Sequence, residues 1–165
     1  MESSNITYLL SKALHPELQD LLFLISKEAK KKNHRVFLVG GLVRDVFLGL
    51  EAKDVDILVE GPAIDFVKEI KENWKERFLN FASPHKVISF PRYGTIKLHF
   101  LEEVVSGLRE LDFSTAREES YPQAGLAPEV KVSTLLPDLA RRDFTVNAIA
   151  VEILPSGEFL LFDQH

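Results

Sequence analysis

Two aspartates stand two residues apart in the segment Lys53-Asp54-Val55-Asp56-Ile57. Side chains two apart on a strand point to the same face, with their Cα atoms roughly 6.6 Å apart at about 3.3 Å per residue. Two carboxylates placed in this way can converge on one or two divalent ions, and Mg²⁺ typically binds one or two carboxylates plus substrate phosphates. Aspartates inside an apolar strand also oppose strand propensity, a conflict that is expected at functional sites. The alternative is an edge strand with a solvated acidic face.

A glycine pair, Gly40-Gly41, follows an apolar run, and Arg44-Asp45 begins three positions later. Glycine lets the backbone approach a ligand closely, and the N–H groups at the start of a helix favour a phosphate. Arg44 can fork onto two phosphate oxygens, whereas we expect Asp45 to be a partner of the helix dipole or an anchor for the loop. The lysine and Ser/Thr of a Walker A loop are absent, as is the GxGxxG spacing. A plain strand–helix turn with a surface arginine is the alternative.

A third group of polar side chains lies in the segment Arg141-Arg142-Asp143-Phe144-Thr145-Val146-Asn147. Adjacent arginines on a helix point roughly 100° apart. We therefore expect at most one of them to face the site and the other to pair with an acid. Asp143, Thr145 and Asn147 offer donors and acceptors that suit either sugar hydroxyls or helix capping.

Asp112 ends another apolar run, just before a polar segment. A third carboxylate delivered by a second strand would suit a metal-assisted attack by a hydroxyl group. The alternative is a strand-end aspartate that is satisfied by the loop backbone.

Composition excludes several classes of site. The chain of 165 residues has no cysteine, which excludes disulfides, thiolate metal sites and a cysteine nucleophile. Its five histidines show no i, i+4 ligand pair, and its formal net charge of −5 does not suggest a protein that coats nucleic acid by charge alone. We expect a soluble cytoplasmic protein, because the polar N-terminus lacks a signal-peptide layout and no apolar run could span a bilayer.

Periodicity predicts the elements that must position these residues. We expect a loose arm over 1–15 and an amphipathic helix from Pro16 to the Lys30–Lys32 run. Further predicted helices cover 42–48, 62–75 and 136–142, the last with Ser133 or Thr134 as N-cap. Predicted strands cover 36–39, 54–59, 77–81, 87–90, 94–100 and 108–113, with a hairpin over 151–154 and 159–162. The segment 114–131 is predicted to be a long loop. The order of elements indicates an α+β, or mixed α/β, sheet.

These elements, in this order, resemble one family closely. The run from Val36 to Asp45 with Asp54-Val55-Asp56 is similar to the opening of class II tRNA nucleotidyltransferases. The family comprises CCA-adding enzymes, their CC- and A-adding relatives, and bacterial poly(A) polymerases. The segments 112–117 and 138–148 are similar to two later motifs of the family. The resemblance covers 36 to about 162 and implies a polymerase-β-like nucleotidyltransferase fold.

The resemblance also implies roles for these residues. Asp54 and Asp56 would hold Mg²⁺, with Asp112 as a third catalytic carboxylate. The triphosphate would lie on Gly40, Gly41 and Arg44, whereas Arg142, Asp143 and Asn147 would orient the nucleotide. ATP or CTP would be the donor, and the 3′-hydroxyl of an RNA, most plausibly tRNA, would attack the α-phosphate.

The resemblance further implies a domain division, with an N-terminal arm and helix over 1–35 and the catalytic head over 36–165. The family's neck, body and tail, which select the base and grip tRNA, are expected outside these residues. Three alternatives stay open: a poly(A) polymerase of the same family, a nucleotide-binding head without turnover, and a metal-dependent glycosyltransferase with a DxD motif.

Overall fold

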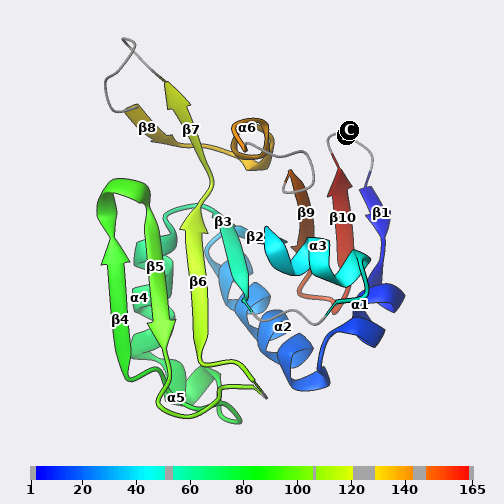
Figure 1. The fold of residues 1–165 in the computed structure, drawn as a ribbon. Helices are drawn as coiled ribbons and strands as arrows, with labels where there is room; N and C mark the ends of the chain where they lie inside the picture. The colour runs from blue at the N-terminus through cyan, green and yellow to red at the C-terminus, as the bar shows by residue number, and fades with distance from the viewer. Residues whose placement is uncertain (1–2, 51–53, 106, 121–128, 143–147, 164–165) are drawn as a thin grey trace.

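The fold is centred on one large mixed sheet. The computed structural model describes residues 3–50, 54–105, 107–120, 129–142 and 148–163. Its eight strands are ordered β1-β10-β9-β2-β3-β6-β5-β4 (Figure 1). In chain order they are β1 (Ser3–Asn5), β2 (Arg35–Val39), β3 (Asp56–Glu60), β4 (Lys86–Phe90), β5 (Thr95–His99), β6 (Glu110–Thr115), β9 (Ile149–Ile153) and β10 (Phe159–Asp163). Neighbouring strands are antiparallel except for β3 and β6, which are parallel. The expected mixed α+β class is confirmed.

Helices and a small ribbon complete the fold. The helices are α1 (Thr7–Ala13), α2 (Pro16–Lys31), α3 (Gly41–Phe47), α4 (Ala63–Glu72), α5 (Trp74–Arg77) and α6 (Leu135–Ala140), with a 3₁₀ turn η1 (Pro91–Tyr93) between β4 and β5. Strands β7 (Arg117–Ser120) and β8 (Glu129–Val132) pair as a separate ribbon, which extends beyond the end of β6 (Figure 1).

The two faces of the sheet pack differently because side chains alternate along each strand. Val36, Leu38, Ile57 and Val59 point into the main core, which also contains the apolar stripe of α2. Their neighbours Phe37, Val39 and Leu58 point to the other face, into a smaller cluster that includes α6. Asp56 pairs directly with Val39, so its side chain lies on this second face.

Three sequence-based expectations differ from the structure. Residues 3–13 are not a loose arm, because β1 pairs with β10 and Leu10 is buried in the main core. The expected strand 77–81 is instead the end of α5 and a turn, where Trp74 and Phe78 stack with ring centroids 4.2 Å apart. The expected loop 114–131 contains the end of β6, all of β7 and part of β8; 121–128 lie outside the described residues.

The start of α6 is held from a distant strand. Thr134 is the N-cap residue, as the sequence allowed, but its side chain makes no capping hydrogen bond. Instead the Leu135 N–H donates to Glu60 Oε1 at 2.6 Å. A cap supplied by β3 therefore ties α6 to the strand that begins with Asp56. No helix among the described residues is long and apolar enough to cross a membrane.

Candidate active site

The predicted carboxylates gather at the middle of the sheet. Asp56 is the first residue of β3, and Asp112 lies in register with it on the parallel strand β6. Asp54 precedes β3 and is exposed, whereas Asp56 is half-buried. The strand therefore begins two residues later than the sequence predicted. The chain brings two of the three aspartates onto one face of two neighbouring strands, with the third at the strand's entry.

The charges of Asp54 and Asp112 act on Asp56. Burial raises the pKa of Asp56, and the charges of Asp112 and Asp54 raise it further, while Arg142 and Lys97 act in the opposite direction. A carboxyl with a raised pKa resists ionisation until a cation compensates its charge. The arrangement therefore favours a cation beside Asp56.

Lys97 is a residue of this site that the sequence analysis missed. It lies on β5 directly opposite Asp112, and its Nζ is 3.1 Å from Asp112 Oδ2 and 3.0 Å from Glu110 Oε2. Hydrogen bonds to Glu110 and Asp112 raise the pKa of Lys97. Its signal in the sequence is one cation between the apolar Ile96 and Leu98 of a predicted strand. Pairing it with Asp112 requires the strand register, which local patterns do not supply.

The glycine turn approaches the carboxylates closely. Gly40 has φ +72°, and a Cβ built on it would lie 3.1 Å from Asp56 Oδ2. Glycine is the residue that tolerates both this backbone conformation and this contact. Arg44 lies on α3, one turn later, and a Cβ on Gly41 would lie 3.4 Å from its Nη2. Arg44 Nη2 also binds Asp45 Oδ1 at 2.7 Å.

Both arginines of the third motif bind the same buried acid. Asp138 is fully buried; its Oδ1 lies 2.7 Å from Arg141 Nη2, and its Oδ2 lies 2.9 Å from Arg142 Nη2. Its Oδ1 also accepts the Arg117 N–H at 3.2 Å. One arginine was expected to pair with an acid; Arg141 does so, and Arg142 binds the same acid, because spacings of three and four residues both reach Asp138. Asp143 and Asn147 lie outside the described residues.

A pocket of about 300 Å³ opens directly over the carboxylates. It lies on the second face of the sheet, at the β4–β5–β6 side of Asp56. Its lining combines acids, a cation, hydroxyl groups and one exposed aromatic ring: Asp56, Phe90, Thr95, Ile96, Lys97, Asp112, Phe113 and Ser114.

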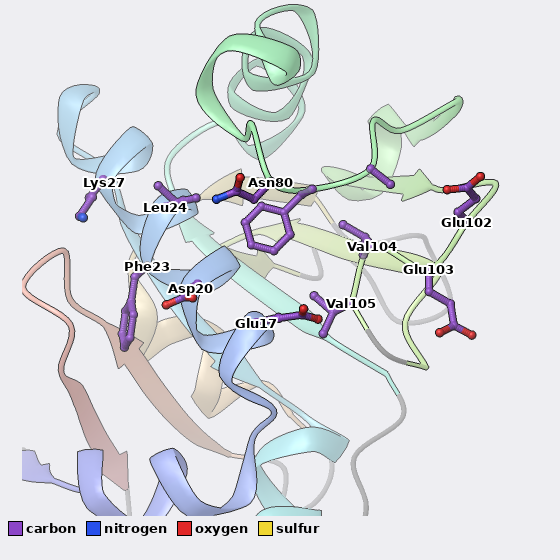
Figure 2. Close-up of a pocket in the computed structure, with 12 residues that line it drawn as sticks. Glu17, Asp20, Phe23, Leu24, Lys27, Asn80, Glu102, Glu103, Val104 and Val105 are labelled. Carbon is purple, nitrogen blue, oxygen red and sulfur yellow. The ribbon is translucent and has the colours of Figure 1, made fainter.

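A larger hollow, of about 890 Å³, lies elsewhere (Figure 2). Residues of α2, the turn after α5 and the β5–β6 connection line it, and none of them belongs to the predicted site. Four carboxylates (Glu17, Asp20, Glu102 and Glu103) contribute to this lining, against the single cation of Lys27. The predicted carboxylates and the Gly40 turn lie outside this hollow, so the smaller pocket, which Asp56 and Asp112 line, is the better candidate.

The donor set fits a hard divalent ion. Within the part of the chain that the structure describes, no three His, Cys, Asp or Glu side chains form a ready metal cluster. Mg²⁺ does not need one, because one or two carboxylates with substrate phosphates and water complete its shell. Asp54 and Asp56 offer those carboxylates, whereas the carboxylate of Asp112 is engaged by Lys97.

Comparison with known proteins decides the family. The "Poly A polymerase head domain" profile matches residues 36–164, most of the chain. This chain belongs to that family. Its relatives include an A-adding tRNA nucleotidyltransferase of Aquifex aeolicus, 42% identical over 72% of this chain and 13% of the relative. An enzyme of the same name from Halalkalibacterium halodurans is 31% identical over 98% of this chain and 34% of its own length. Nucleotidyltransferases of this family generally use divalent metal ions.

Solved structures give the same result. A CCA-adding enzyme without ligand matches with a TM-score of 0.80 and 33% identity, covering 99% of this chain and 36% of the enzyme. A Thermotoga maritima CCA-adding enzyme complexed with tRNA matches at 0.73 and 32%, over 99% of this chain and 33% of its own. A CCA-adding enzyme with CTP matches at 0.72 and 31%, over 99% and 33%. The head-domain chain thus spans about a third of these enzymes, and the polymerase-β-like fold is confirmed.

Proposed function

We propose that this head domain carries the catalytic centre of a Mg²⁺-dependent, template-independent nucleotidyltransferase that adds nucleotides to the 3′ end of tRNA. The observation that carries the proposal is the in-register pair Asp56–Asp112 beside the Gly40 turn, in a family whose relatives are named tRNA nucleotidyltransferases. ATP and CTP are the proposed donors, in keeping with a solved CCA-adding enzyme that binds CTP.

In this proposal Asp54 and Asp56 hold the ion, which when bound stabilises the charge on the attacking and leaving oxygens. The backbone at Gly40 passes close enough to Asp56 to place a triphosphate beside the carboxylates. Gly41 is the next residue of this turn, and Arg44 supplies a fork of donors to phosphate oxygens. The oxygen of the RNA 3′-hydroxyl forms a bond to the α-phosphorus as the bond to the bridging oxygen breaks. Pyrophosphate leaves, and the hydroxyl proton passes to solvent or to a nearby carboxylate.

Arg142, Asp143 and Asn147 are the proposed residues that orient the nucleotide. The role of Arg142 is supported by its position. Its charge lowers the pKa of Asp56, and Asp138 holds its guanidinium. An arginine whose orientation is fixed in this way loses little side-chain freedom when it meets a ligand. Asp112 is the proposed third carboxylate, held by Lys97 on the same face.

The test is transfer of α-labelled ATP or CTP to tRNA that lacks its 3′-terminal nucleotides, with and without Mg²⁺. We expect labelling that requires the metal and is lost in Asp54→Asn and Asp56→Asn. An extension limited to the terminal A or CCA supports tRNA repair, whereas long adenylate tails identify the poly(A) polymerase alternative. Binding of Mg·ATP without any transfer identifies the nucleotide-binding head alternative and contradicts the proposal.

A further inference from the structure

Phe90 is an exposed aromatic ring inside the carboxylate pocket. It is the last residue of β4, half of its surface is exposed, and it lines the same 300 Å³ pocket as Asp56 and Asp112. Among the described residues no other aromatic ring packs against it. A phenylalanine left uncovered beside carboxylates offers an apolar aromatic face to a ligand.

The adjoining turn η1 lines other hollows. Arg92 and Tyr93 lie in hollows that they share with Arg117 and with Val130 of β8, and one of these hollows also reaches Lys68 of α4. Phe90 is therefore the exposed aromatic ring of the carboxylate pocket. Aromatic side chains are the surfaces on which the bases of single-stranded nucleic acid stack. We call the exposed face of Phe90, on the β4–β5 hairpin, the hairpin platform.

The order of the strands places this platform opposite the glycine turn. Across the sheet the order is β2, β3, β6, β5, β4, so the carboxylates on β3 and β6 separate the Gly40 turn, which follows β2, from Phe90 on β4 (Figure 1). Phosphoryl transfer requires the attacking and leaving oxygens to lie roughly in line on opposite sides of the phosphorus. If the pyrophosphate lies beside Gly40 and Arg44, the attacking hydroxyl must arrive from the side of β5 and β4.

We infer that the hairpin platform binds the 3′-terminal nucleotide of the RNA acceptor, with its base stacked on Phe90. The inference rests on the proposed function, from which it takes the side of the triphosphate. The inference adds a binding surface for the acceptor. A terminal base that stacks on Phe90 holds the hydroxyl of its own ribose beside Asp112. Stacking accepts any base, and an acceptor whose terminal base changes with each addition needs that tolerance.

The test uses a short single-stranded RNA with 2-aminopurine as its 3′-terminal base, whose fluorescence is quenched by stacking. We expect the wild-type chain to quench it, and Phe90→Ala to lose the quench and bind the RNA about 5- to 150-fold more weakly. Phe90→Tyr should restore both signals, whereas Phe90→Leu, which keeps the apolar volume but no aromatic ring, should not. Tyr8→Ala on α1 is the matched control. Tyr8 is also an exposed aromatic residue, and α1 contacts β10, which lies near the opposite end of the sheet from β4.

Binding of Mg·ATP by the same proteins distinguishes failure of the platform from failure of the proposed function. Phe90→Ala should weaken RNA binding more than it weakens Mg·ATP binding, because the triphosphate is assigned to the Gly40 turn on the other side of the carboxylates. Equal losses of the two affinities overturn the platform. A wild-type chain that binds no Mg·ATP contradicts the proposed function. A chain that binds Mg·ATP but does not quench the RNA, or quenches it equally after Phe90→Ala, overturns the platform alone. Quenching of 2-aminopurine at the 5′ end instead of the 3′ end overturns it as well.

Discussion

Asp56 and Asp112 face each other in register across β3 and β6, the one parallel pair of strands among those described in the sheet. Their proximity raises the pKa of Asp56, and burial of Asp56 contributes more than the neighbouring charge does. A half-buried carboxylate beside a second one lowers the free energy of unfolding when no cation is bound. Such a loss of stability is expected where the pair serves a metal-dependent reaction.

Asp56→Asn is expected to leave the metal-free domain as stable as the wild type or to raise its melting temperature. A carboxyl whose pKa is raised on folding destabilises the folded state at pH values above that pKa, and asparagine removes the charge while keeping the shape. The opposite result is expected for Lys97→Met, which leaves Asp112 and Glu110 without their shared cation. Thermal unfolding in EDTA measures both. A lower melting temperature for Asp56→Asn would show that its charge stabilises the fold.

Gly40→Ala is expected to disturb both stability and nucleotide binding. Alanine at φ +72° and ψ −141°, a backbone conformation that favours glycine, costs about 1–3 kcal/mol, and its Cβ would also press on Asp56 Oδ2. Gly49 provides the matched control, because its φ is +68° but nothing lies within 4 Å of a Cβ built there. Gly49→Ala should therefore show the backbone cost alone and keep Mg·ATP affinity. Equal effects of the two substitutions on binding would separate Gly40 from the site.

Arg44→Ala is expected to weaken binding of ATP more than binding of adenosine, because the guanidinium is assigned to phosphate oxygens. Arg109→Ala is the control for loss of one positive charge, since Arg109 is exposed on the β5–β6 connection. Competition binding with ATP, AMP and adenosine gives the comparison. An equal loss of affinity for ATP and adenosine would place Arg44 outside the triphosphate site.

Asp138→Ala is expected to destabilise the domain by about 3 kcal/mol, because it leaves two half-buried guanidinium groups without their buried partner. Asp65→Ala is matched by position, since Asp65 is also the acid in the first turn of a helix but is exposed. We expect it to cost less than about 1 kcal/mol. Urea unfolding of both variants measures the difference. Similar losses would mean that the acid acts through the helix dipole alone.

Local patterns in the sequence predicted the site better than its surroundings. The DxD spacing and the glycine turn are contained in short segments, and the sheet indeed brings Gly40 against Asp56. The spacing of Asp138 from Arg141 and Arg142 was also readable, since three and four residues separate neighbours on a helix surface. We expected one arginine to pair with an acid, but did not identify Asp138 as that acid or as the partner of both arginines.

Contacts between distant segments could not be predicted in this way. Lys97 contacts Asp112 because of the register of β5 and β6, and β1 pairs with β10, although almost the whole chain separates these two strands in the sequence. Such pairings depend on the packing of the complete sheet, which a window of neighbouring residues does not encode. The same holds for Glu60, which caps α6 from β3.

Calorimetric titration of the chain with ATP, with and without Mg²⁺, is the most direct test of Asp54 and Asp56 as the metal carboxylates. Asp54→Asn and Asp56→Asn are the paired variants, and circular dichroism checks their folding. We expect binding that requires Mg²⁺ in the wild type and is lost in both folded variants. Binding that needs no metal, or that survives in the variants, would contradict the assignment of Asp54 and Asp56 as the metal carboxylates of a nucleotidyltransferase.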